Sequence, residues 1–256
     1  EMGGENSATK KHWVNSGNIT FTKDSWVKGY VNAGGILGRV NNASIRVVEG
    51  SAPSANSGTI TFSGKCGDGG AEDNLYIGGL TGRIEAFKQL TGGFTNSGSV
   101  IFDGVMDGGT AYVGGLVGSC SDNPLEEGLE WTGNLVFTGE KLQATSGYAG
   151  GIFGTCVSAI PNAIVYSDIV GAGCEGVGMV TGSPRSDVVV ATNAKVGGSI
   201  ALEMADLENS EGIVTYAPKV EKLTAENFHG YVYGGETIWA EGSDYDGCSF
   251  LSVKPE

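Results

Sequence analysis

Short stretches of alternating apolar and polar residues recur along the chain, separated by turns rich in glycine, asparagine and serine. In Ile19-Thr20-Phe21 and Ile60-Thr61-Phe62 the apolar residues are two positions apart, so both point to one face of a strand. A second β-like run surrounds a glycine pair, as in Tyr76-Ile77-Gly78-Gly79-Leu80, and a third follows, as in Ser44-Ile45-Arg46-Val47-Val48. We therefore expect three short strands in each repeating unit and no long helix.

Two signatures keep the same order through the units. The opening signature is Asn-Ser-Gly before a β-like run, at Gly17, Gly58 and Gly98, with a weaker copy at Gly133 and a degenerate one at Ser167-Asp168. The closing signature reads Gly34-Gly35-Ile36-Leu37-Gly38, Gly78-Gly79-Leu80-Thr81-Gly82, Gly114-Gly115-Leu116-Val117-Gly118 and Gly150-Gly151-Ile152-Phe153-Gly154. The four openings are 41, 40 and 35 residues apart, a period typical of solenoids and propellers.

Three strands per unit favour an all-β fold, a parallel β-helix (three-faced β-solenoid) of about five coils, over a four-bladed propeller, whose blades need four strands each. We expect the coils at about 15–55, 56–95, 96–131, 132–166 and 167–199. Residues 1–10 read as a polar tail, 11–199 as the solenoid repeats, and 200–256 as an irregular C-terminal cap over the exposed strand edges.

Stacking equivalent positions of the coils predicts two interior ladders. One contains Ile19, Ile60, Val100 and Leu135, and the other contains Phe21, Phe62, Phe102 and Phe137. Each fully buried side chain contributes about 1.5–3 kcal/mol, so the ladders form a substantial part of the core. Gly171 stands where the next phenylalanine is expected, which indicates a decaying last repeat.

These signatures resemble the GLUG-type repeats of large bacterial surface proteins, found beside immunoglobulin A peptidases and in many Bacteroidetes cell-surface proteins. The resemblance covers about residues 13–200. It implies a secreted or surface-exposed solenoid that acts in adhesion or displays another domain. It carries no catalytic residue onto this chain, because the zinc-binding motif of those peptidases is a separate segment.

The chain is acidic, with 15 Lys and Arg against 29 Asp and Glu and a net charge of −14. Such a surface repels nucleic acid and anionic lipid headgroups, so we expect neither as a partner. No apolar run approaches a membrane span, and the first residues lack the apolar core of a signal peptide. We expect an extracellular or cell-surface location, with an export signal removed or outside this sequence.

The five cysteines show neither CxxC nor ligand spacing with histidine. Cys120 and Cys156 each follow a closing signature by two residues, so we expect them to be neighbours in adjacent coils, as buried thiols or as a disulfide. The only histidines are His12 and His229, so HExxH is absent, and GxSxG is absent as well. We expect no metal site built from these residues.

Most carboxylates stand in turn-like stretches, where solvation is their expected role. Calcium is a minor alternative at two clusters, Asp68/Glu72/Asp73 and Asp244/Asp246, although neither completes a known calcium motif. We expect no other cofactor.

Tyr76, Tyr112 and Tyr148 precede the glycine pair at the same offset, which predicts a stacked row. We favour ladder packing within the fold; if the row faces outward, these three residues are the candidate binding residues for a sugar or a protein.

The leading hypothesis is a non-catalytic adhesion or display module that binds a glycan or protein through its exposed faces. The alternatives are a β-helical polysaccharide-degrading enzyme, or the passive repeat region of a larger immunoglobulin A-type peptidase. An enzyme of the first kind needs clustered acids and bases on one strand face, and no such cluster is recognisable in the sequence.

Overall fold

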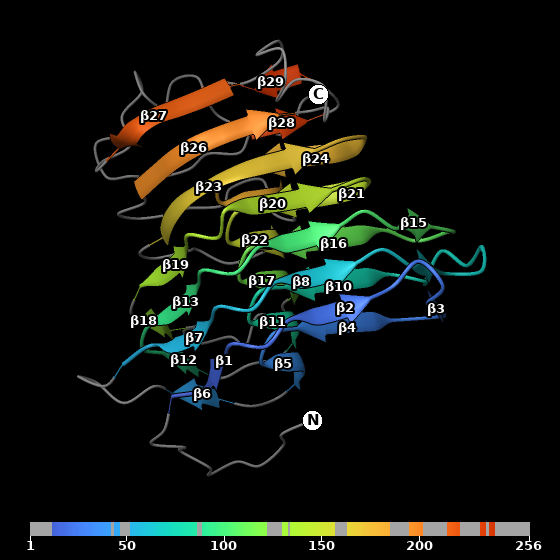
Figure 1. Cartoon of the computed structure of the whole chain (residues 1–256), viewed down its shortest axis with the longest axis horizontal. Helices are drawn as coiled ribbons and strands as arrows, with labels where there is room; N and C mark the ends of the chain where they lie inside the picture. Colours follow the sequence, from blue (N-terminus) through green and yellow to red (C-terminus); the bar gives the residue numbers. More distant parts are fainter. Residues whose placement is uncertain are drawn as a thin grey trace.

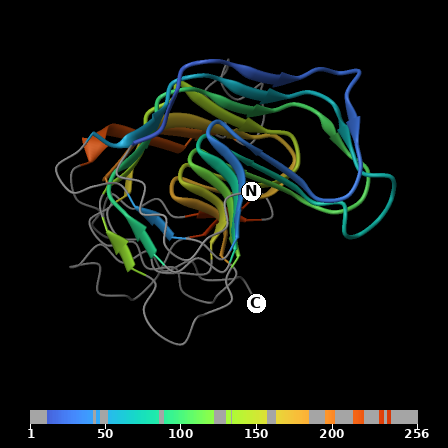
Figure 2. The same cartoon turned by 90° about the horizontal axis from the view of Figure 1, so that it is seen from below.

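The computed structural model is a stack of β-coils that rises from the N-terminus to the C-terminus (Figure 1). It describes residues 12–41, 44–46, 52–85, 89–121, 130–132, 134–156, 163–184, 195–201, 214–220, 231–233 and 236–238. Viewed along the stack, successive coils follow nearly the same path (Figure 2). These residues contain strands and no helix, and hence no helix that could span a membrane. The predicted parallel β-helix is confirmed.

The largest sheet has eleven strands in two rows that merge. The first row contains β1 (Val14–Asn15), β7 (Ser54–Asn56), β13 (Phe94–Asn96) and β19 (Leu135–Phe137). The second row contains β2 (Ile19–Phe21), β8 (Ile60–Phe62), β14 (Val100–Phe102) and β20 (Lys141–Ala144). The long strand β23 (Ala163–Gly171) pairs with both β19 and β20, and it is followed by β26 (Lys195–Ala201) and β27 (Val214–Val220).

Four smaller sheets complete the coil. The seven-stranded sheet contains β4 (Val31–Gly34), β10 (Leu75–Gly78), β16 (Ala111–Gly114), β21 (Gly147–Gly150), β24 (Cys174–Gly178), β28 (Tyr231–Tyr233) and β29 (Glu236–Ile238). The five-stranded sheet contains β5 (Leu37–Asn41), β11 (Thr81–Glu85), β17 (Val117–Ser121), β22 (Phe153–Cys156) and β25 (Thr181–Pro184). Two three-stranded sheets contain β6 (Ser44–Arg46), β12 (Gln89–Thr91) and β18 (Glu130–Thr132), and β3 (Trp26–Val27), β9 (Lys65–Cys66) and β15 (Val105–Met106).

The coil is divided into more strands than the three expected. The second coil, for example, contains the six strands β7 to β12. Most have two to four residues, because the Ser-Gly and Gly-Gly steps bend the chain between them. Near the C-terminal end the pairing changes from parallel to antiparallel, since β27 pairs with β26 and β28 pairs with β24 in that sense.

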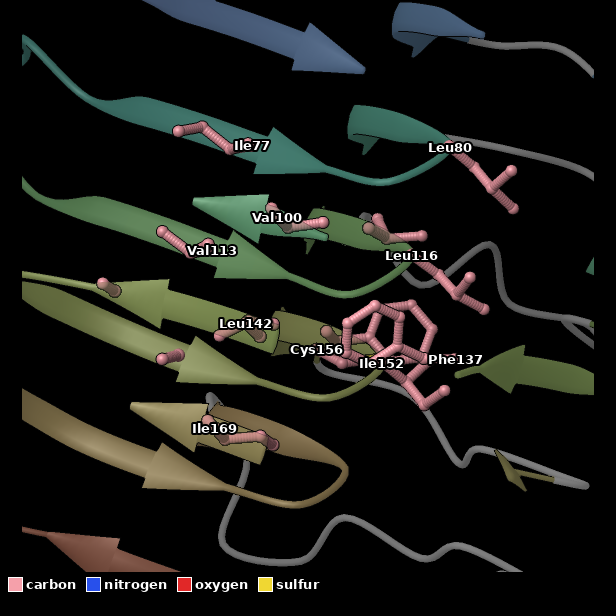
Figure 3. Packing of buried hydrophobic residues seen from close by; sticks show 14 of the residues in the cluster. Ile77, Leu80, Val100, Val113, Leu116, Phe137, Leu142, Ile152, Cys156 and Ile169 are labelled. Atoms are coloured by element: carbon pink, nitrogen blue, oxygen red, sulfur yellow. The ribbon is translucent and has the colours of Figure 1, made fainter. Parts of the chain in front are cut away.

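The aliphatic interior ladder continues farther than predicted, and through a different residue of the fourth coil. Ile19, Ile60, Val100, Leu142 and Ile169 are in register along the second row of the large sheet. Val100, Leu142 and Ile169 point into the interior, as Figure 3 shows, and all three are fully buried. Leu135 does not belong to this ladder, because it pairs with Phe94 in the first row.

The phenylalanine ladder also ends earlier than predicted. Phe21, Phe62 and Phe102 are in register, but the next positions are Ala144 and Gly171. Phe137 instead continues the row of Asn96. The run Leu135-Val136-Phe137, predicted to follow the fourth opening, is therefore out of register with Val100-Ile101-Phe102. The two runs have the same alternation, which is why the sequence suggested the match and the unit boundary at 132. Gly133 itself lies outside the described residues. Gly171 lies in the row of the phenylalanines, next to Ala144, so its predicted place in that row is confirmed.

The asparagines of the opening signature form a buried ladder. The amide nitrogen of Asn15 donates to Oδ1 of Asn56 at 2.7 Å, and that of Asn56 donates to Oδ1 of Asn96 at 2.8 Å. The ladder ends where the amide of Asn96 donates to the carbonyl oxygen of Gly115 at 2.7 Å. In coil four, Phe137 occupies the position next to Asn96 in its row, and Ala144 occupies the position next to Phe102 in the other row. A ring thus replaces asparagine in one row, and a small residue replaces a ring in the other. The exchange roughly conserves interior volume, which is what a packed core tolerates best.

The glycines of both signatures sit where coils touch. A Cβ on Gly79 would overlap the side-chain amide of Asn96, and one on Gly115 would overlap the ring of Phe137. The second glycine of the closing signature thus leaves room for the ladder residue of the next coil. A Cβ on Gly98 would overlap the carbonyl oxygen of Gly58 in the coil before it. The two signatures are therefore two parts of one coil-to-coil contact.

This contact predicts different outcomes for the same substitution at equivalent glycines. We expect Gly98→Ala to lower the free energy of unfolding by at least about 2 kcal/mol, because the new methyl group meets backbone that cannot move aside. Gly17→Ala is the matched control: the nearest atom to its Cβ is Oδ1 of Asn15 at 3.6 Å, so the change stays within about 0.5 kcal/mol. Urea unfolding measures both, and equal losses would contradict the stacking.

Candidate functional site

The three candidate tyrosines form a stacked row. Strands β10, β16 and β21 place Tyr76, Tyr112 and Tyr148 in register on neighbouring coils. The ring centroids are 5.3 Å apart for the first pair and 5.5 Å for the second, with interplanar angles of 9° and 14°. These spacings lie within the usual range for aromatic pairs. The prediction of a stacked row is confirmed.

A fourth ring extends this row toward the first coil. Tyr30 stacks on Tyr76 with centroids 6.5 Å apart and an interplanar angle of 5°. Aligning the repeats in the sequence does not identify Tyr30, because the residue in register with Tyr76 is Asn32. Tyr30 and Asn32 are two residues apart, and the strand alternation could have placed both on one face. We call the four rings, from Tyr30 to Tyr148, the tyrosine column.

The column is mostly an internal packing element. Tyr76 is only 2% exposed, which agrees with the favoured ladder packing and leaves almost none of its ring to a binding partner. Tyr112 and Tyr148 are partly buried, and stacking covers ring faces that a sugar would need. Tyr30 is 51% exposed and ends the column. The surface that the column offers to a partner is therefore concentrated at its first ring.

A charged cluster lies beside this first ring. The Arg83 guanidinium carbon is 4.7 Å from the ring centroid of Tyr76 and 5.5 Å from that of Tyr30, both cation–π distances. Glu85 joins Arg83, at 2.6 Å, to Arg39, whose Nε donates to the same carboxylate at 2.7 Å. Arg39 and Arg83 are in register on adjacent strands, so Glu85 offsets their repulsion. The cluster fixes the Arg83 guanidinium next to the exposed ring of Tyr30, and Arg39 is joined to it through Glu85.

Both ends of the column carry a carboxylate partner. The Tyr30 hydroxyl donates to Glu72, and the Tyr148 hydroxyl donates to Glu175 at 2.6 Å. The hydrogen bond to Glu72 is the main reason that the pKa of Tyr30 is raised, so its phenol stays protonated at neutral pH. These bonds hold the end rings in place.

The first calcium candidate, Asp68/Glu72/Asp73, has other partners. Asp73 accepts hydrogen bonds from the backbone amides of Gly29 at 2.7 Å, Asp68 at 3.0 Å and Gly70 at 3.1 Å. Asp68 forms an ion pair with Lys28, and Glu72 accepts from Tyr30. No group of three potential metal ligands occurs in the described part of the chain. Asp244 and Asp246 lie outside the described residues.

The thiols are packed in the fold. Cys120 and Cys156 are in register on neighbouring strands and buried, as expected. Burial raises the pKa of Cys66 to about 11 and that of Cys174 to about 12, so both thiols are protonated at neutral pH and are poor nucleophiles. His12 is exposed, whereas His229 and Cys248 lie outside the described residues.

The backbone cradle of Asp73 predicts a pH dependence of stability. Amide hydrogen bonds, led by that of Asp68, lower the pKa of Asp73 below its usual range. A lowered folded-state pKa stabilises the fold above the unfolded pKa of about 4, and the contribution is lost as pH falls through the folded value. We expect Asp73→Asn to be less stable than wild type at pH 7, with the gap narrowing below about pH 4. Urea unfolding at several pH values measures it, and a gap independent of pH would contradict the cradle.

Comparison with known proteins adds no relative to this picture. No family of known proteins, no curated protein and no solved structure matches the chain. The resemblance to GLUG-type repeats therefore rests on the two signatures alone.

Proposed function

We propose that this chain is a non-catalytic module for adhesion or display, located outside the cell or on a bacterial surface, which binds a glycan or a protein through its exposed faces. The observation that carries the proposal is the exposed end of the tyrosine column. There a rigid ring, Tyr30, lies beside the Arg39–Glu85–Arg83 cluster. Tyrosine and arginine fixed side by side are the residues that most often dominate the affinity of binding surfaces.

Rigidity supports this function. Tyr30 is held by the ring of Tyr76, by the guanidinium of Arg83 and by the carboxylate of Glu72. A side chain that is already ordered loses little conformational entropy when a partner binds, so more of the contact energy appears as affinity. The parallel stack supplies the framework, because the first coil, which carries Tyr30, is hydrogen-bonded to the second coil through pairs such as β4 and β10.

The surroundings of the acidic residues support a non-catalytic role. A glycoside hydrolase needs two carboxyl groups that face a common substrate position. Here Glu85 is held between two arginines, and Asp73 is held by backbone amides. An apolar cavity between the large and the five-stranded sheets is lined by residues such as Trp13, Leu80 and Phe94, which offer no acid or base. The GLUG-like signatures support the surface location.

The proposal predicts binding without turnover. The purified chain is incubated with plant, host and microbial glycans and with immunoglobulin A, and retention and products are measured, the latter by mass spectrometry. We expect retention of at least one partner with no new products. Tyr30→Ala is expected to weaken the interaction about tenfold if the partner contacts the column end, a loss typical of a residue that dominates binding.

Tyr112→Phe is the matched control, since it keeps a ring inside the column and leaves Tyr30 in place. New products that persist after repurification would replace the proposal with an enzymatic function. Retention of no member of the panel would also count against an adhesive role.

A further inference from the structure

The narrow side of the solenoid, at the right of Figure 1, is formed by the short strands β3, β9 and β15. Trp26, Lys65 and Val105 are in register on β3, β9 and β15. Their neighbours in the strands, Val27, Cys66 and Met106, pack against the core. Strand alternation therefore directs the first three to solvent.

The row is unusually apolar for a surface. Among the described residues, the exposed large hydrophobic side chains are Val14, Trp26, Tyr30 and Val105, and two of these four stand in this row. Trp26 is 61% exposed and Val105 is 62% exposed, on either side of Lys65. An exposed tryptophan is a candidate contact for a ligand, because its large ring buries much surface on contact.

The indole of Trp26 is fixed rather than loose. Its Nε1–H donates to the carbonyl oxygen of Gly67 in the next coil at 3.0 Å. This bond satisfies the only polar atom of the side chain, so the surface left to a partner is the π system. The ring is thus positioned before any ligand arrives.

The charged groups around the row neutralise one another. Lys65 pairs with Asp107 at 2.6 Å, and Lys28, two residues after Trp26, pairs with Asp68. The local charge is therefore close to zero on a chain of net charge −14. Lys23 and Asp24, the exposed charged residues just before Trp26, have opposite signs, so a polyanion meets no excess of positive charge here and is repelled by the whole chain. A polycation finds that Asp68 and Asp107 are already paired. A neutral ligand rich in hydroxyl groups faces neither obstacle.

We propose that Trp26, with the ion pairs Lys65–Asp107 and Lys28–Asp68, forms a subsite for a hexopyranose unit of a neutral polysaccharide. The π face of the indole attracts the polarised C–H bonds on one face of the sugar ring. The ammonium groups donate to the ring hydroxyls and the carboxylates accept from them, which gives orientation. This inference rests on the proposed binding function and names its ligand class and a face distinct from the column end.

Affinity electrophoresis tests the subsite with three soluble neutral polysaccharides built of hexoses, a β-glucan, an α-glucan and a galactomannan, and with polygalacturonate as the charged counterpart. We expect the wild-type chain to be retarded by at least one neutral polysaccharide and not by polygalacturonate. Trp26→Ala is expected to weaken that retardation at least tenfold, and Lys65→Met to weaken it less. Val14→Ala, a change at an exposed apolar residue outside the row, is the matched control and is expected to bind as wild type does.

Circular dichroism and unfolding midpoints establish that each variant is folded, and Trp26→Tyr, which keeps a ring, provides a second variant if Trp26→Ala is not. Retardation of wild type that survives in Trp26→Ala would overturn the subsite while leaving the proposed function intact. Binding of immunoglobulin A or polygalacturonate without any neutral polysaccharide would overturn the ligand class. Absence of all binding would count against both proposals.

Discussion

The close approach of backbone to backbone between successive coils is the constraint on which this structure depends. Parallel coils share one hydrogen-bonding distance of about 4.8 Å, so every turn must superimpose on the turn below it. At Gly58 and Gly98 the carbonyl oxygen of the previous coil occupies the space of a Cβ, and at Gly79 the amide of Asn96 does so. The high glycine content therefore reflects steric demand at contacts, with positive φ at other turns such as Gly67 and Gly147.

Once the coils are superimposed, like residues meet like residues. Asparagines hydrogen-bond along the axis, rings stack, and aliphatic side chains fill the interior between them. In the asparagine row, each buried amide finds its hydrogen-bond partner in the next coil: Asn56 accepts from Asn15 and donates to Asn96. Without the neighbouring coils, these polar groups of Asn56 would be buried without those partners. The fourth coil shows how far a row tolerates change, because Phe137 and Ala144 exchange the large and small positions of the preceding coil.

The same stacking determines what the surface can present to a partner. Inside the tyrosine column each ring covers its neighbour, so only the terminal Tyr30 is widely exposed. On the narrow side, the residue that follows Trp26 in its row is Lys65, which does not cover the indole ring, and Trp26 remains 61% exposed. Both exposed rings belong to the first coil. Tyr30 is available to a partner because it is the first ring of its row. Trp26 is available because the next residue of its row is a lysine and not another ring.

The sequence alone determined the repeat, the alternation within strands, the all-β solenoid and the row formed by Tyr76, Tyr112 and Tyr148, because these depend on local periodicity and on recurrence at a fixed spacing. It could not place the fourth coil, since Leu135-Val136-Phe137 and Val100-Ile101-Phe102 have the same alternation and only the fit between coils distinguishes them. Nor could it identify Tyr30 as the end of the column or Trp26 as an exposed platform. Whether a side chain is exposed, and which groups it contacts, depends on the neighbours that stacking brings next to it. Those neighbours are about forty residues away along the chain.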